Sequence, residues 1–146
     1  MNNDKTIQAA RALIDGFNQR DLNIWERVLA NDFEADYPGS HGLGKEAAKM
    51  YNLAFLNASD DIHFDVLHTY VDGDRVVLQC GVSATLDHDL VTPMGTFPAT
   101  HKPDVKVPVP FVLIAEVNDG KIVSEETVWN QLEVFGTIWG ILPVPA

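Results

Sequence analysis

The spacing of apolar residues changes once along this chain, and the change constrains the fold more than any other feature. Up to residue 57, apolar side chains recur at intervals of three and four, which predicts helices over roughly 4–18, 22–29 and 44–57. From residue 62 the interval becomes two, which is typical of strands. The helices therefore come first and the strands follow, an order typical of α+β folds.

Two turn signals divide the second half of the chain. Asp72-Gly73 and Asn118-Asp119-Gly120 each supply residues that accept the positive φ of a tight hairpin turn. Long antiparallel strands are predicted over 62–70, 75–87, 107–117 and 121–129, after a short extended piece over 30–37. We expect a single domain over 1–146, in which three N-terminal helices close a curved antiparallel sheet into a cone with an open end.

Residues 88–106 interrupt the strand pattern, because Pro93, Pro98 and Pro103 cannot continue a strand ladder. We predict a long loop there, which either covers a sheet edge or closes over a site. A short apolar segment over 132–143 is predicted to end the chain as a helix. An apolar cleft at the open end of such a cone is a common place for a small-molecule site.

The charge balance excludes several partners. Ten Lys and Arg against 21 Asp and Glu give a net charge of −11, so neither nucleic acid nor an anionic membrane surface is expected as a partner.

No pair of His residues has the spacing of metal ligands on one helix face, so no metal site is expected. The one cysteine, Cys80, and an N-terminus without signal-peptide features favour a cytoplasmic protein with no membrane span.

Several short motifs share their order and spacing with one known family. They are Phe17-Asn18-Gln19-Arg20-Asp21, Asp32-Phe33, Gly44-Lys45-Glu46-Ala47, the segment 94–103, Asp119-Gly120-Lys121-Ile122-Val123 and Trp139-Gly140-Ile141-Leu142-Pro143. In these the chain resembles the SnoaL-like polyketide cyclases, a branch of the nuclear transport factor 2-like superfamily. The resemblance implies a cone-shaped α+β barrel and a homodimer paired through the open sheet face. It also implies ring closure by aldol condensation with a pocket Asp and no metal or organic cofactor.

In this chain, a residue with an amide side chain occupies the position that matches the family's Asp. Counting from Lys121 puts Asn130 at the position, and counting back from Gly140 puts Gln131 there. An amide cannot accept and release a proton near neutral pH. Two hypotheses follow from this departure. Either other side chains supply the acid/base chemistry, or the chain is a non-catalytic small-molecule binding module that has lost the catalytic Asp.

Four side chains are candidates for catalysis. Asn130 could hydrogen bond a carbonyl or enolate oxygen, or it could cap the final helix. Glu126 has the strand parity of Asn130 and is the best replacement base if that face lines the cavity; otherwise it is solvated. His88 could carry protons at the edge of the loop, or it too could be solvated. Asp36 lies where relatives often place a polar pocket residue.

The candidates for substrate binding are mostly aromatic: Tyr37, Trp25, Tyr51, Trp129 and Gln131. Each of the aromatic residues could instead serve core packing. Together with the resemblance, these residues predict an enzyme that acts on a hydrophobic, carbonyl-bearing small molecule of polyketide type. The predicted chemistry is proton transfer coupled to cyclisation or isomerisation, without a cofactor.

Overall fold

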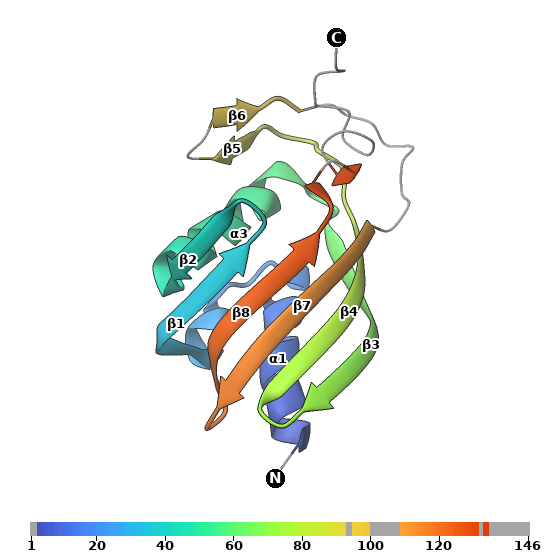
Figure 1. Ribbon diagram of the computed structural model, residues 1–146. Helices are drawn as coiled ribbons and strands as arrows, with labels where there is room; N and C mark the ends of the chain where they lie inside the picture. The colour runs from blue at the N-terminus through green and yellow to red at the C-terminus, as the bar shows by residue number, and fades with distance from the viewer. Residues whose placement is uncertain (1–2, 93–94, 100–108, 132, 135–146) are drawn as a thin grey trace.

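Three helices pack against the concave side of a curved sheet in the computed structural model, which describes residues 3–92, 95–99, 109–131 and 133–134 (Figure 1). The first elements are α1 (Asn3–Asn18), α2 (Asn23–Val28), β1 (Leu29–Tyr37), β2 (Ser40–Gly44) and α3 (Lys45–Ala58). They are followed by β3 (His63–Asp72), β4 (Arg75–Ser83), β5 (Leu90–Thr92), β6 (Gly95–Phe97), β7 (Val109–Asn118) and β8 (Lys121–Trp129). The predicted α+β cone is confirmed.

The main sheet has the strand order β2-β1-β8-β7-β4-β3. All neighbouring strands run antiparallel except β1 and β8, which are parallel. Both predicted hairpin turns are present, with Gly73 at φ 59°, Asp119 at 51° and Gly120 at 75°. These angles explain why the turns need Gly or Asp.

Two segments outside the predicted helices and strands contain strands. Residues 40–44, on the Gly-rich stretch before α3, form β2 because β1 offers a free edge there. Within the predicted loop over 88–106, the short strands β5 and β6 pair with each other. Residues 93–94 and 100–106 of that loop lie outside the described residues, as does the predicted C-terminal helix beyond residue 134.

The core consists of two hydrophobic clusters. The larger one joins α1, α2 and α3 to the sheet around fully buried side chains such as Leu13, Trp25 and Leu78. The smaller one lies where the β5–β6 hairpin meets the end of α3, and its members are Ala58, Leu86, Leu90, Val109 and Val134 (Figure 1). In the described part of the chain, no helix is long and apolar enough to cross a bilayer.

A β-bulge in β8 decides which side chains of this strand face the helices. The partners of two consecutive β7 residues are Ile122 and Ser124, so Val123 is an extra residue on β8. A bulge of one residue shifts the alternation of the side chains after it to the opposite face. As a result, both Ile122 and Glu125 are buried, although they are three positions apart. A similar bulge lies at Leu67 in β3.

Candidate functional site

An apolar pocket lies between the concave face of the sheet and the helices. Its aromatic wall consists of Phe17, Trp25, Tyr51, Phe55, Phe64, Phe111 and Trp129. The polar side chains that reach it are Tyr37, Asn52, Glu125 and Thr127. A mostly apolar cavity with a few convergent polar groups is the usual form of a small-molecule site.

Glu125 is the ionisable carboxyl of this pocket and is only 4% exposed. Its Oε1 accepts a 2.6 Å hydrogen bond from the Tyr37 hydroxyl, and Oε2 has no hydrogen-bond partner among the described residues. Burial raises the pKa of Glu125 to about 7, while the hydrogen bond from Tyr37 opposes this rise. A carboxyl with such a pKa can take up and release a proton near neutral pH.

Two further contacts hold the side chain of Tyr37, one at its hydroxyl and one at its ring. The hydroxyl accepts a 3.0 Å hydrogen bond from Nδ2 of Asn52, which also donates to the carbonyl of Ala48 one turn earlier on α3. The ring stacks on Tyr51 with 4.4 Å between centroids. Burial and the neighbouring Glu125 raise the pKa of Tyr37 far above its usual value. Tyr37 therefore stays a neutral donor that fixes the Glu125 carboxyl.

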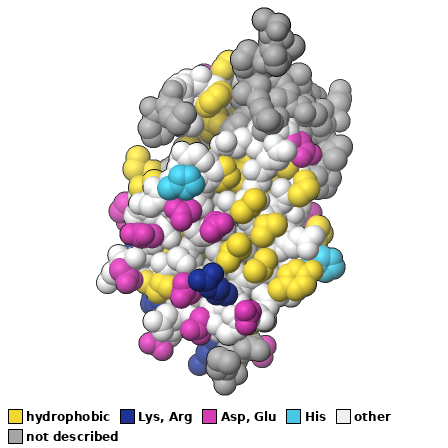
Figure 2. All heavy atoms as spheres, viewed as in Figure 1, with side chains coloured by type: hydrophobic (Ala, Val, Ile, Leu, Met, Phe, Trp, Pro, Cys, Tyr) yellow, Lys and Arg dark blue, Asp and Glu magenta, His cyan; other side chains and the backbone are white. Residues whose placement is uncertain are grey.

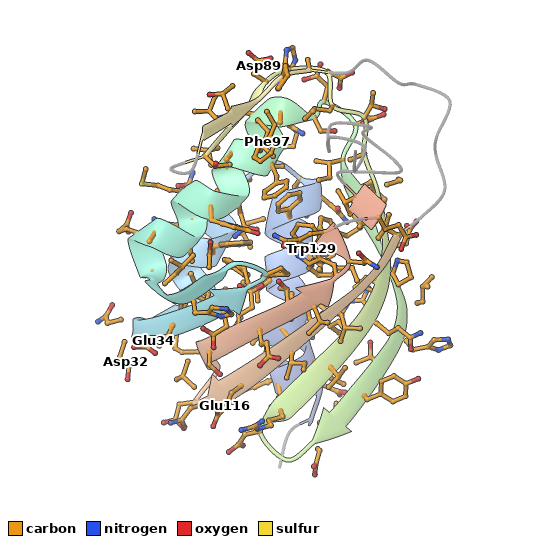
Figure 3. All side chains as sticks on the ribbon, turned by 45° about the horizontal axis from the view of Figure 1, so that its top comes forward. Asp32, Glu34, Asp89, Phe97, Glu116 and Trp129 are labelled. Carbon is orange, nitrogen blue, oxygen red and sulfur yellow. The ribbon has the colours of Figure 1, made fainter. Side chains whose placement is uncertain are left out.

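Edge contacts between rings build part of the aromatic wall. Phe55 of α3 meets Trp129 with its ring nearly perpendicular, at 6.0 Å between centroids. Figure 3 shows Trp129 at the end of β8, on the side of the sheet that faces α3. The indole nitrogen of Trp25 donates to the carbonyl of Leu13 at 2.9 Å. Trp25 thus offers the pocket an apolar surface.

Four of the five predicted substrate-binding residues line the pocket, namely Tyr37, Trp25, Tyr51 and Trp129. Their contact with a substrate stays a prediction. The fifth, Gln131, is exposed, and its Nε2 donates to the carbonyl of Pro38 at 3.0 Å. Gln131 therefore ties the end of β8 to the turn after β1 and does not face the pocket.

Asp36 and His88 lie outside the pocket. Side chains alternate along β1, so the burial of Tyr37 turns Asp36 outward, where its Oδ1 accepts a hydrogen bond from the backbone of Gly42 at 2.8 Å. The ring of His88 is exposed, and its Nε2 lies 3.1 Å from the carboxylate of Asp60. Among the described residues, no three His, Cys, Asp or Glu side chains are grouped as metal ligands.

Glu126 and Asn130 do not reach the pocket either. The strand face that carries Glu126 points outward, because the bulge at Val123 reverses the alternation, and the side chain is exposed. Asn130 is also exposed, and its Oδ1 accepts a 3.1 Å hydrogen bond from the backbone of Glu133. This contact has the form that the capping interpretation of Asn130 predicts.

Three polar pocket residues were not predicted from the sequence: Glu125, Asn52 and Thr127. One signal could have found two of them. In a regular strand Trp129 and Glu126 face opposite sides, so they cannot both line one pocket. Counting back by twos from Trp129 leads to Thr127 and Glu125. Asn52 lies on the amphipathic helix α3, and the spacing of apolar residues does not distinguish it from a surface residue.

Comparisons with known proteins agree with this architecture. The family model of the SnoaL-like domain matches residues 10–125. A structure of a SnoaL-like polyketide cyclase from Jannaschia sp. CCS1 has a TM-score of 0.81 at 18% identity, covering 96% of this chain and 94% of that one. TsrD from Streptomyces laurentii has a TM-score of 0.78 at 14% identity, covering 96% and 98%.

A third structure is that of TerC co-crystallized with polyporic acid, with a TM-score of 0.68 at 21% identity and coverage of 92% and 98%. No curated protein matches the chain in sequence. At these identities, the three structures show a shared fold. The match of the family model over most of the chain shows more than that: the chain belongs to the family of SnoaL-like domains.

Proposed function

We propose that this chain is an enzyme that moves a proton on a hydrophobic small molecule bearing an enolisable carbonyl, with Glu125 as the acid/base group. The observation that carries the proposal is a buried carboxyl, with its pKa raised to about 7, in a mostly apolar pocket. Membership of the SnoaL-like family supports a role in small-molecule chemistry. The co-crystal of TerC with polyporic acid supports a ligand of this kind.

The proposed reaction starts with the carboxylate form of Glu125. Its unbonded Oε2 accepts a proton from the carbon next to the substrate carbonyl, and the electron pair of the C–H bond moves to form an enolate. In an isomerisation, the carboxyl returns the proton to another carbon. In a cyclisation, the enolate carbon attacks a second carbonyl and Glu125 protonates the resulting alkoxide. No oxidation state changes overall, so side chains alone can supply this chemistry.

Tyr37 and the aromatic wall have separate tasks in this mechanism. The hydrogen bond from Tyr37 holds Oε1 and stabilises the carboxylate, which leaves Oε2 directed to the substrate. The aromatic side chains bind the hydrophobic body of the substrate and exclude water. Exclusion of water keeps the pKa of Glu125 high enough for the proton to be returned.

A matched pair of variants tests the proposal. The protein is incubated in heavy water with β-keto esters and polycyclic ketones, and deuterium at carbon is measured by mass spectrometry. Glu125→Gln should lower the exchange rate by about 100-fold or more, the usual size of an acid/base contribution. The neighbouring Glu126→Gln, which changes the same functional group on the outer face, should retain the wild-type rate.

Two other outcomes would change the conclusion. A ligand that the wild type retains without exchange or conversion would favour the alternative, a non-catalytic binding module. Exchange that survives Glu125→Gln but is lost in Glu126→Gln would show that another group carries the reaction.

We also propose that two copies of the chain pair through the outer face of the sheet. Apolar side chains follow one another across the strands there, as Figure 2 shows, with Tyr70 opposite Val77 and Val77 opposite Ile114. Val128, 52% exposed, lies opposite Val112 in the next row. An exposed apolar patch of this kind is typical of an association surface. Analytical ultracentrifugation should give a dimer for the wild type and a monomer for Val128→Glu; a monomeric wild type would contradict the proposal.

A further inference from the structure

Thr127 carries a buried hydroxyl that the protein does not satisfy. The residue is 6% exposed, lines the pocket, and follows Glu125 by two positions on the same face of β8. Its Oγ1 has no hydrogen-bond partner in the described part of the chain. Buried hydroxyl groups are almost always paired, so this one needs an explanation.

Tyr37, Asn52 and one carboxylate oxygen of Glu125 are hydrogen bonded to one another. The Tyr37 hydroxyl donates to Glu125 and accepts from Asn52. The cross-strand neighbour of Thr127 on β7 is Leu113, which offers no polar side-chain atom. None of these neighbours hydrogen bonds to Oγ1, although all of them line the same pocket.

Packing does not explain a threonine at this position. Valine has the same branched shape and would fill the same space opposite Leu113, and the pocket uses valine at positions 82 and 109. Valine would also avoid the cost of burying an unpaired hydroxyl. The hydroxyl therefore lowers the stability of the ligand-free protein, and a partner from outside the chain would compensate for that cost.

We propose that Thr127 is a specificity-determining residue that hydrogen bonds a second oxygen of the substrate, beside the carbonyl that Glu125 activates. This inference rests on the proposed function and names the substrate class more closely. Positions i and i+2 of a strand are about 7 Å apart. The substrate is then a hydrophobic diketone or hydroxyketone whose two oxygens lie along one edge. A hydroxyl both donates and accepts, so Thr127 pairs with either a carbonyl or a hydroxyl oxygen.

The first test needs no ligand. Thr127→Val should raise the melting temperature by about 3 °C, because it removes an unpaired buried hydroxyl without changing the shape. Thr127→Ser, which keeps the hydroxyl, should not raise it. A lower melting temperature for Thr127→Val would mean that the hydroxyl has a partner within the protein, and this would overturn the inference.

The second test compares two probes, 2-naphthol and 2,7-dihydroxynaphthalene, whose two hydroxyls lie on one edge. The wild type should bind the diol more tightly, and Thr127→Val should lower the affinity for the diol by about tenfold while leaving that for 2-naphthol unchanged. Thr127→Ser should keep the preference. A wild type that does not prefer the diol, or a variant that loses both affinities equally, would overturn the inference. Neither readout uses turnover, so a failure of Glu125 as acid/base group remains distinguishable.

Discussion

The hydroxyl of Tyr37 donates a 2.6 Å hydrogen bond to Oε1 of Glu125 and so joins β1 to β8 inside the pocket. Two opposing effects set the pKa of this carboxyl. Burial favours its neutral form, and the hydrogen bond favours the carboxylate. Their balance raises the pKa to about 7, so both protonation states are populated at neutral pH. The proposed chemistry depends on this balance.

Removing the hydrogen bond from Tyr37 should raise the pKa of Glu125. In Tyr37→Phe the carboxylate loses its donor, so the pKa of Glu125 should rise further, by about one to two units. Because the proposed reaction needs the carboxylate, the rise of the exchange rate with pH should move to higher pH by the same amount. The exposed Tyr70→Phe serves as the control. A pH profile that is the same in Tyr37→Phe and wild type would contradict this role of Tyr37.

Glu125 should also make the protein less stable as the pH rises. Its pKa is about 7 in the folded protein against an ordinary value of 4.5, so the folded state binds more protons between these values. Its contribution to stability is therefore fully present below pH 4.5 and is lost as the pH rises through 7. The loss amounts to about 3 kcal/mol, since one pKa unit corresponds to about 1.4 kcal/mol.

Denaturant unfolding at a series of pH values checks this contribution. Glu125→Gln removes the ionisable group, so its stability relative to wild type should increase from pH 4.5 to above 7. Glu126→Gln, which makes the same change at an exposed position of the same strand, serves as the matched control. A flat difference for both variants would show that burial does not perturb Glu125.

Asn18 should anchor the end of α1 to the edge strand. Its Nδ2 donates to the carbonyl of Phe64 at 2.8 Å and its Oδ1 accepts from the Phe64 amide at 2.9 Å, in place of a neighbouring strand. Asn18→Ala leaves both backbone groups of Phe64 unpaired and should cost about 2 kcal/mol of unfolding free energy, measured by urea denaturation. Asn57→Ala, at an exposed position of α3, should be nearly neutral. Equal effects of the two substitutions would argue against the anchoring role.

The features that the sequence predicts correctly are local ones. The change of apolar spacing places the helices and long strands, and Asp72-Gly73 and Asp119-Gly120 locate both hairpins. Local chemistry also explains the contact of Asn130, a residue type preferred at helix N-caps, whose Oδ1 accepts a hydrogen bond from the backbone of Glu133. The four aromatic residues predicted for substrate binding all line the pocket, whereas Gln131 does not.

Glu126 lies outside the pocket for a reason that local patterns do not reveal. A single extra residue, Val123, exchanges the two faces of β8, so Glu125 is buried where regular alternation favours Glu126. The contact between Tyr37 and Glu125 spans 88 positions of the chain and exists because β1 lies parallel to β8. The spacing of apolar residues carries no information on strand order, so this pair could not be predicted.

Direct titration of the Glu125 carboxyl tests the central claim without any substrate. Carbon-detected NMR of the glutamate side-chain carboxyls, recorded over pH 3 to 9 for wild type and Glu125→Gln, identifies the Glu125 resonance as the one missing from the variant. The account predicts that this resonance titrates near pH 7, well above the ordinary value of 4.5 for a glutamate. A Glu125 resonance that titrates near the ordinary value of 4.5 would contradict the claim that the pocket holds a carboxyl ready for proton transfer at neutral pH.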